Sequence, residues 1–135
     1  MVIFMERSSA SLWRKINSRY NMVGNECTNC GKAYFPPRLI CKECGRKSKM
    51  QSKKFNGKGE VYSYSKIHVP TEAFKDSAPY TVGIIKLDEG PFVEGHIIDD
   101  GKGVKIGMRV KSAFRKMDMD GEEGLIYYHF KFVPE

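Results

Sequence analysis

Four cysteines constrain the fold of this chain more than any other feature. They form two C-x-x-C pairs, Cys27/Cys30 and Cys41/Cys44, which are ten residues apart, and a glycine directly follows each pair. A C-x-x-C turn points both thiolates at one ion, so two such turns supply the four corners of a tetrahedral zinc site. Glycine can adopt the positive φ that a tight turn over the sulfurs needs. The pattern predicts a zinc ribbon over residues 25–52.

Two other uses of the cysteines stay open at this point. Iron in a rubredoxin-like site takes the same four ligands. A disulfide framework is disfavoured, because the N-terminus MVIFMERSS lacks the basic region of a signal peptide and a reducing compartment keeps thiols free. Four protein ligands leave a metal no open position for water or substrate, and they use every cysteine in the chain. The predicted metal is therefore structural, and no thiol nucleophile remains.

An amphipathic helix is predicted over residues 8–22, within an N-terminal segment 1–24. Trp13, Ile16 and Tyr20 recur at i, i+3 and i+7, and basic and polar residues occupy the other faces. Two interpretations are open: the apolar face packs on the chain's own barrel, or it presents Trp13, Ile16 and Tyr20 to a partner protein.

From residue 53 the apolar pattern changes to period two, which indicates strands. In the first strand, Val61, Ser63 and Ser65 are predicted to share one face, and Tyr62 and Tyr64 the other. Five short antiparallel strands suit a closed barrel of the oligonucleotide/oligosaccharide-binding (OB) type over residues 53–135. The predicted fold is thus mainly β: an N-terminal helix, a rubredoxin-like zinc ribbon, and a barrel with strands at 59–69, 80–88, 91–98, 108–115 and 125–133.

Composition narrows the class of protein. With 135 residues, of which 41% are hydrophobic, the chain can build one ordinary core. No window approaches 18 uninterrupted apolar residues, so a membrane span is not expected. We predict a cytoplasmic protein with no membrane partner.

The net charge of +7 is unevenly distributed. Residues 1–58 hold 13 Lys/Arg and 3 Asp/Glu, whereas residues 59–135 hold 10 and 13. A groove for single-stranded nucleic acid interleaves aromatic residues with cations, but Glu60 and Glu94 lie among the barrel aromatics. The barrel is therefore a poor nucleic-acid reader, while the basic ribbon can still bind phosphate.

The chain carries no recognisable catalytic motif. It has no Walker loop, no G-x-G-x-x-G, no G-x-S-x-G and no H-E-x-x-H, and its histidines at 68, 96 and 129 stand alone in predicted strands. We predict that it is not an enzyme.

Several segments together resemble a known family. They include LWRKI at 12–16, the two cysteine pairs with FPPR at 35–38, GEVYSYSKIH at 59–68, PYTVGIIKLDEGP at 79–91, GHIID at 95–99 and IGMRV at 106–110. The chain resembles the archaeal and bacterial proteins of unknown-function family 35, acyl-CoA-associated OB-fold proteins with a rubredoxin-like zinc ribbon.

The resemblance implies a partner-binding role. Archaeal members of this length accompany acetoacetyl-CoA thiolase and 3-hydroxy-3-methylglutaryl-CoA (HMG-CoA) synthase. It implies a scaffold that bridges both enzymes in a hetero-oligomer and channels the intermediate of the mevalonate (isoprenoid) pathway. It also implies that Cys27, Cys30, Cys41 and Cys44 are the metal ligands.

Coenzyme A or an acyl-CoA at a shared site is a further expectation. Arg38 is the first candidate for a phosphate contact, with Lys32 and Arg46 behind it, because a guanidinium can bind phosphate through two hydrogen bonds. The alternative function is an RNA- or single-stranded-DNA-binding protein that uses the basic ribbon. An enzyme that acts on acyl-CoA is a third, weaker interpretation.

Overall fold

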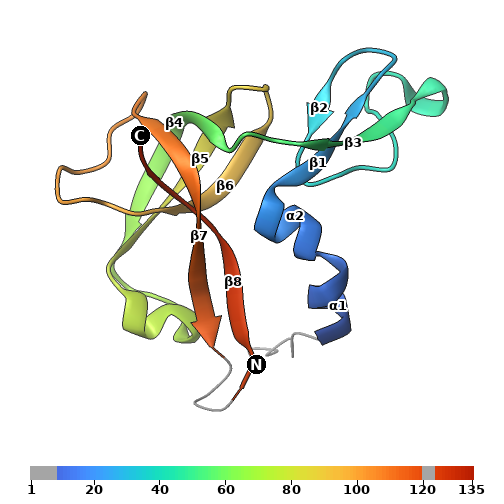
Figure 1. Cartoon of the computed structure of the whole chain (residues 1–135). Helices are drawn as coiled ribbons and strands as arrows, with labels where there is room; N and C mark the ends of the chain where they lie inside the picture. The colour runs from blue at the N-terminus through green and yellow to red at the C-terminus, as the bar shows by residue number, and fades with distance from the viewer. Residues whose placement is uncertain (1–8, 120–123) are drawn as a thin grey trace.

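The computed structural model describes residues 9–119 and 124–135. Two short helices lead into a small three-stranded sheet, and a five-stranded closed barrel follows (Figure 1). This is the mainly β fold that the sequence predicts. The small sheet comprises β1 (Val23–Cys27), β2 (Ala33–Tyr34) and β3 (Met50–Lys54). The barrel comprises β4 (Lys58–Ile67), β5 (Tyr80–Leu87), β6 (Phe92–Ile97), β7 (Arg109–Met119) and β8 (Ile126–Pro134).

The predicted N-terminal helix is present as two helices, α1 (Ser9–Arg14) and α2 (Ile16–Asn21). The break falls at Lys15, whose N–H closes a tight turn on the Leu12 carbonyl at 3.1 Å. The Ser18 hydroxyl also donates to the Lys15 carbonyl at 3.0 Å, a side-chain bond that competes with the helical ladder. The second helix ends at Asn21, and its C-cap residue Met22 has a left-handed φ of 50°.

The small sheet has the order β2-β1-β3, with both pairs antiparallel. A 3-10 turn, η1 (Gly45–Lys47), follows the last cysteine. The chain then passes from β3 directly into the barrel through Phe55 and Gly57. The sheet therefore stands beside one end of the barrel, as Figure 1 shows at the upper right.

The barrel has the order β4-β5-β6-β8-β7. It closes where the start of β4 pairs with the start of β7, and a single parallel pair, Ile97 with Phe132, joins β6 to β8. A second 3-10 segment, η2 (Glu72–Ser77), covers the connection between β4 and β5. All five predicted strands are present, with ends that differ from the prediction by a few residues.

The predicted faces of the first barrel strand are wrong beyond Val61. Val61 pairs with Ile85, but Ser63 pairs with Ile84, so a β-bulge inserts one extra residue at this point. Because paired residues point to the same side of a sheet, Val61 and Ser63 point to opposite sides. Simple alternation cannot reveal such an insertion.

The core lies inside the barrel and extends toward the small sheet. Its most buried side chains are Val61, Ile85, Leu87, Val110 and Phe132. Gly95 has no side chain because a Cβ there would come within 2.8 Å of the Phe132 ring.

The small sheet is joined to this core by an aromatic contact. Phe35 packs edge-on against Phe55 and Phe130, with ring centroids 6.2 and 5.8 Å apart. Met22 and Phe55 are themselves buried in the same cluster. Within the described ranges, no helix is long and apolar enough to cross a membrane.

Candidate functional site

The four cysteines converge on one point of the small sheet. Cys27 ends β1, Cys41 and Cys44 flank the turn before η1, and all four sulfurs lie within 4.8 Å of one another. The Cys27 and Cys44 sulfurs are 3.8 Å apart, and those of Cys30 and Cys41 are 3.4 Å apart. A tetrahedral zinc ion with Zn–S bonds of about 2.3 Å separates its sulfurs by about 3.8 Å. The geometry therefore fits a four-thiolate zinc ion.

Each cysteine pair forms the predicted turn. The Gly31 N–H donates to the Cys27 carbonyl at 2.7 Å, and the Gly45 N–H donates to the Cys41 carbonyl at 3.0 Å. Both glycines have positive φ, 75° and 52°. Such a conformation suits glycine because a side chain would be strained there.

Tyr34 and Asn29 contact the sulfurs, which the sequence analysis did not anticipate. The Tyr34 hydroxyl lies 3.2 Å from the Cys41 sulfur, and this hydrogen bond lowers the pKa of Cys41 to about 6. The Asn29 amide donates to the Cys44 sulfur at 3.2 Å. Donors of this kind stabilise thiolates, the form that a metal binds.

Four protein thiolates would complete the coordination of a zinc ion. Cys27 and Cys41 are buried, at 0% and 1% exposure, so the ion would be shielded by the protein. Such a site supplies folding energy and offers no position for a substrate. The donor set thus fits a structural metal.

The three predicted phosphate contacts surround the small sheet but do not converge. Lys32 forms an ion pair with Glu43 at 2.8 Å, which raises the pKa of Lys32. The Arg38 guanidinium lies over the Tyr34 ring, 5.6 Å from its centroid. Arg46 is exposed on η1.

The Asn25 side chain holds the backbone of Arg38 in place through two hydrogen bonds, and no local sequence pattern indicates this contact. Its side-chain oxygen accepts from the Arg38 N–H at 3.1 Å, and its amide donates to the Arg38 carbonyl. Asn25 is itself buried on β1, 9% exposed. The loop that carries Arg38 is therefore attached firmly to the small sheet.

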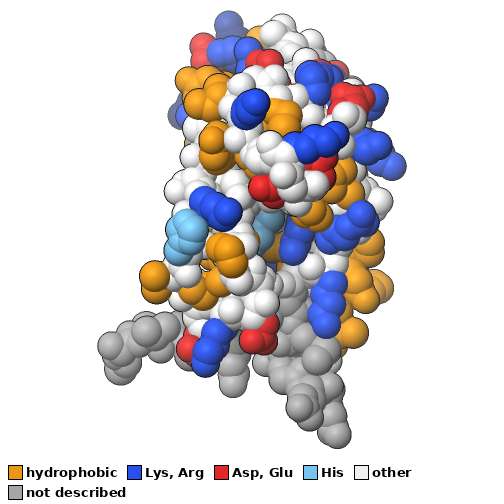
Figure 2. All heavy atoms as spheres, turned by 90° about the vertical axis from the view of Figure 1, so that its left-hand side faces the viewer, with side chains coloured by type: hydrophobic (Ala, Val, Ile, Leu, Met, Phe, Trp, Pro, Cys, Tyr) orange, Lys and Arg blue, Asp and Glu red, His pale blue; other side chains and the backbone are white. Residues whose placement is uncertain are grey.

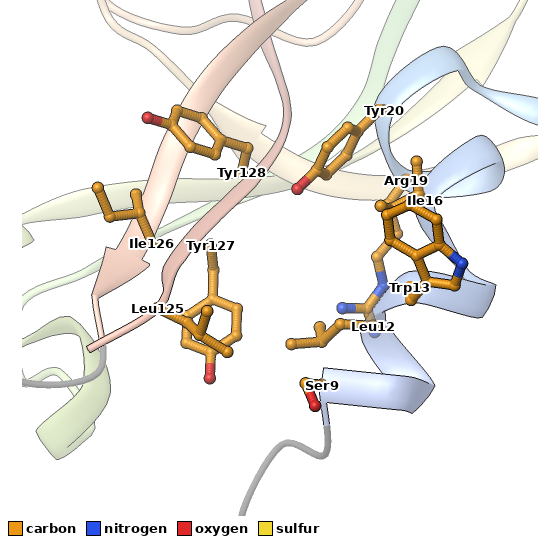
Figure 3. Close-up of a pocket in the computed structure, with 10 residues that line it drawn as sticks. All are labelled: Ser9, Leu12, Trp13, Ile16, Arg19, Tyr20, Leu125, Ile126, Tyr127 and Tyr128. Carbon is orange, nitrogen blue, oxygen red and sulfur yellow. The ribbon is translucent and has the colours of Figure 1, made fainter.

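An apolar groove lies between the N-terminal helices and the beginning of β8 (Figure 3). It has a volume of about 230 Å³. Leu12 and Tyr20 face it from the helices, and Leu125 and Tyr127 face it from the barrel (Figure 3). In the described residues of the two helices every charge is positive, from Arg14, Lys15 and Arg19.

Part of the apolar face of the N-terminal helices packs on the chain's own barrel, and another part is exposed. Tyr20 packs edge-on against Phe114 of β7, with ring centroids 5.1 Å apart, so it belongs to the chain's own fold. Trp13 is 76% exposed, although Leu12 and Ile16 beside it are half-buried. Trp13, Ile16 and Tyr20 all line the groove.

A second apolar surface lies on the loop between β2 and η1. Leu39 is 95% exposed and Ile40 is 61% exposed. Both follow Arg38, whose backbone Asn25 anchors, so the loop displays two aliphatic side chains on a fixed support.

A larger hollow, of about 670 Å³, separates α2 and the small sheet from the barrel. Phe35, Phe92 and Phe130 supply aromatic walls; Lys15 and Arg19 supply positive charge, and Glu94 supplies one negative charge. On the barrel face seen in Figure 2, basic, acidic and apolar side chains are interspersed. Positive charge is therefore concentrated beside the helices and the small sheet, as the charge split in the sequence indicates.

Comparison with protein-family models gives two matches. Residues 19–49 match the rubredoxin-like zinc ribbon domain of ChsH2, and residues 53–115 match the C-terminal OB-fold domain of ChsH2. The first match spans the four cysteines, and the second spans β4 to β6 and the start of β7.

Curated relatives extend over nearly the whole chain. A DUF35 domain-containing scaffold protein of Methanothermobacter thermautotrophicus is 47% identical over 132 residues, 97% of this chain and 99% of that protein. A protein of the same description from Methanocaldococcus jannaschii is 46% identical over 90% of this chain and 87% of its own length. One from Pyrococcus furiosus is 35% identical over 90% of this chain and 89% of its own length.

A solved structure has the same architecture. It is described as an Ltp2-ChsH2(DUF35) aldolase, with a TM-score of 0.68, 26% identity and 97% coverage of both chains. The overall fold of this chain therefore recurs, over almost its whole length, in a chain of known structure.

Proposed function

Because this chain belongs to the DUF35 family, we propose that it is a non-catalytic scaffold subunit that bridges acetoacetyl-CoA thiolase and HMG-CoA synthase in the mevalonate pathway. The observation that carries the proposal is the 47% identity, over 97% of the chain, to a DUF35 domain-containing scaffold protein. The neighbour described as an Ltp2-ChsH2(DUF35) aldolase supports a role in assembly with an enzyme. The two named enzymes come from the family resemblance.

A bridge needs two separate contact surfaces, and we propose two of the exposed apolar surfaces among the described residues for this role. One is the groove beside Trp13, and the other is the loop with Leu39 and Ile40. In Figure 1 the helices reach the lower right of the molecule, and the small sheet lies at the upper right. Partners on these two surfaces would be held by one small scaffold, so that an intermediate could pass between them.

Coupling of the two enzymes makes thermodynamic sense. Condensation of two acetyl thioesters is uphill, and the next reaction draws it forward if the intermediate is passed on directly. The scaffold would raise the effective concentration of one active site at the other. The chain itself would need no chemistry.

A coenzyme A contact at this junction is part of the same proposal. The hollow between α2, the small sheet and the barrel combines aromatic walls with the cations Lys15 and Arg19, which outnumber the single carboxylate of Glu94, and such a mixed lining suits a nucleotide-bearing cofactor. Arg38 follows Pro37 of this lining and lies over the Tyr34 ring, and it stays a candidate phosphate contact, as do Lys32 and Arg46.

Reconstitution with purified enzymes tests the scaffold. The tagged chain is mixed with the thiolase and the synthase of the same organism, after nuclease treatment, and the mass of the complex is measured by light scattering. We expect a ternary complex of fixed ratio that does not form without the chain. Leu39→Ser should remove one enzyme and Trp13→Ala the other.

Each way in which the reconstitution could fail favours a different alternative function. If neither enzyme binds and the chain instead retains nucleic acid that nuclease removes, the RNA- or single-stranded-DNA-binding alternative replaces the scaffold. That alternative also requires affinity that falls steeply with salt, because phosphate binding releases counterions. Thioester turnover by the isolated chain would favour the enzyme interpretation.

A further inference from the structure

A second hollow lies on the barrel beside η2, away from the small sheet and the helices. It has a volume of about 250 Å³, enough for a phosphate group but too small for a whole nucleotide. Its lining combines Lys66 from β4, Thr81 from β5, His96 from β6 and Lys131 from β8. Four strands of the barrel therefore contribute a hydrogen-bond donor to one place.

These residues lie at the level of one row of paired residues, where β4 and β6 end and β5 begins. Lys66 pairs with Thr81, Thr81 pairs with Ile97, and Ile97 pairs with Phe132. Thr81 and Ile97 are buried, whereas His96 and Lys131 each precede a member of this row and therefore point to the outer face of the sheet. The β6–β8 contact thus brings side chains together that lie 65 positions apart between Lys66 and Lys131.

The positive charge in this hollow is not neutralised in the way it is elsewhere on the protein. Across residues 9–119 and 124–135, Lys66 and Lys131 take part in none of the ion pairs, whereas Lys32, Lys53, Lys58 and Arg109 each face a carboxylate. Asp99 is the acidic residue in the lining, and its Oδ1 accepts from the Gly101 and Gly103 N–H groups at 2.9 Å each. These two hydrogen bonds hold the Asp99 carboxylate against its own loop.

Two basic side chains of this lining, Lys131 and His96, have lowered pKa values. Burial lowers the pKa of Lys131, and the neighbouring charge of Arg115 lowers it further. Burial also lowers the pKa of His96, and Lys131 and His129 lower it further, against Glu94, which raises it. Like charges held together in partly dry surroundings are relieved by a bound anion.

An aromatic wall adjoins the hollow. Tyr80 stacks on His96 with ring centroids 4.8 Å apart and planes within 4°, and Phe74 of η2 lies against both rings. The stack fixes the His96 imidazole at the rim. Tyr80 and His96 both line the hollow, so a ligand larger than phosphate would contact these rings.

We infer that this hollow is a binding site for a phosphate dianion, either free phosphate or the terminal phosphate of a phosphomonoester whose remaining part rests on the aromatic wall. Lys66 and Lys131 would supply charge, while Thr81 and His96 would orient the oxygen atoms. Fixed cationic donors recognise phosphate through short, charge-assisted hydrogen bonds. The site lies apart from both surfaces used in the proposed scaffold and does not depend on that function.

Titration of the isolated, metal-loaded chain tests the site. Inorganic phosphate, adenosine monophosphate and adenosine are added separately, and backbone and imidazole signals are followed by nuclear magnetic resonance. We expect saturable shifts at Lys66, Thr81, His96 and Lys131 with both phosphates and none with adenosine. Tighter binding of the monophosphate than of phosphate identifies a phosphomonoester, and equal binding identifies free phosphate.

Matched variants decide whether the hollow is responsible. Lys131→Gln should weaken phosphate binding about tenfold or more, the usual effect of losing a charged hydrogen bond. Lys66→Gln, at a more exposed position, should also weaken it, and the exposed Lys86→Gln on β5 should leave it unchanged. Non-saturable shifts, binding of adenosine as tight as the monophosphate, or equal losses in the Lys86 and Lys131 variants would overturn the proposal.

Discussion

The small sheet and the barrel are stabilised by different interactions. The barrel buries a continuous apolar cluster, in which Val61, Ile85, Leu87, Val110 and Phe132 are each at most 1% exposed. In the small sheet the side chains buried to that degree are Cys27 and Cys41. A unit of this size cannot bury enough apolar surface to offset its conformational entropy, so a metal takes the place of a core.

The two regions are nevertheless connected. Phe35 of the small sheet contacts Phe55 and Phe130, and Met22 and Phe55 belong to the barrel's buried cluster. The barrel can therefore support the small sheet, but the small sheet contributes little to the barrel core. This asymmetry gives the following predictions, from the largest effect to the smallest.

The largest effect should follow loss of a thiolate ligand. Cys41→Ser should release the metal and unfold residues 23–54, because metal binding in such units supplies about 10 kcal/mol or more of folding free energy. The barrel should stay folded. Elemental analysis gives the metal content, and hydrogen exchange of the two regions gives their separate stabilities.

A matched control is Ser52→Ala, on an exposed position of β3, which should retain one metal ion per chain. Protected amides in residues 23–54 of a metal-free Cys41 variant would contradict the comparison, since the small sheet would then have a sufficient core of its own.

Removal of a core aromatic residue should have the opposite result: it should destabilise the barrel and leave metal binding intact. Phe132→Ala should lower the free energy of unfolding of the barrel by about 3–5 kcal/mol, because it leaves a cavity at a fully buried position. The four thiolates should still bind metal. Denaturant unfolding followed by circular dichroism measures the loss, and a thiol-reactive dye in the native protein reports whether the cysteines stay protected.

Phe92→Ala is the control for side-chain size, since Phe92 is 51% exposed and should cost far less stability. A cost equal to that of Phe132→Ala would mean that burial does not govern the barrel's stability.

The helices allow a test that separates binding from folding. Trp13→Ala should weaken partner binding by about 2 kcal/mol, as expected for an interface aromatic residue, and leave the unfolding temperature unchanged because the side chain is mostly solvent-exposed. Tyr20→Ala should instead destabilise the chain, since its ring packs on Phe114. Calorimetry of binding and of unfolding measures both quantities.

If Trp13→Ala lowered the unfolding temperature and left partner affinity unchanged, the tryptophan would belong to the fold and not to an interface. The groove would then be a packing contact between the helices and the barrel and not a binding surface for a partner.

The smallest effect should come from the ion pair where β7 meets the turn after β5. Arg109 donates to both Asp88 oxygens, at 2.7 and 2.8 Å, and this lowers the pKa of Asp88. A lowered carboxyl pKa stabilises the fold above the unfolded pKa, and that contribution is lost as the pH falls through the folded value. Asp88→Asn should therefore reduce stability slightly at neutral pH, and the difference should vanish in acid.

Unfolding at several pH values checks this, with Asp76→Asn on the exposed η2 segment as the control. A stability difference that persists below the folded pKa of Asp88 would assign the effect to packing and not to charge.

Sequence reasoning succeeded where the information is local. The cysteine spacing and its glycines predict both turns of the metal site, and period-two patterns predict all five barrel strands. It failed where distant segments decide the geometry. The bulge after Val61 depends on pairing with Ile85, the Arg38 loop depends on Asn25, and Lys32 is already paired with Glu43. None of these contacts leaves a periodic signal.

The sequence alone therefore determined the elements of this protein, because turn chemistry and side-chain periodicity act over a few residues. It also predicted a metal-ligand set, since thiolates at this spacing have few other uses, and the four sulfurs lie within 4.8 Å of one another. Only the tertiary structure decided which surfaces are available. The pairing of β6 with β8 lets Lys66 and Lys131 line one hollow, and α2 packs on the barrel so that Tyr20 is half-buried while Trp13 stays exposed. Those outcomes depend on contacts between residues far apart in the chain, which only the folded barrel brings together.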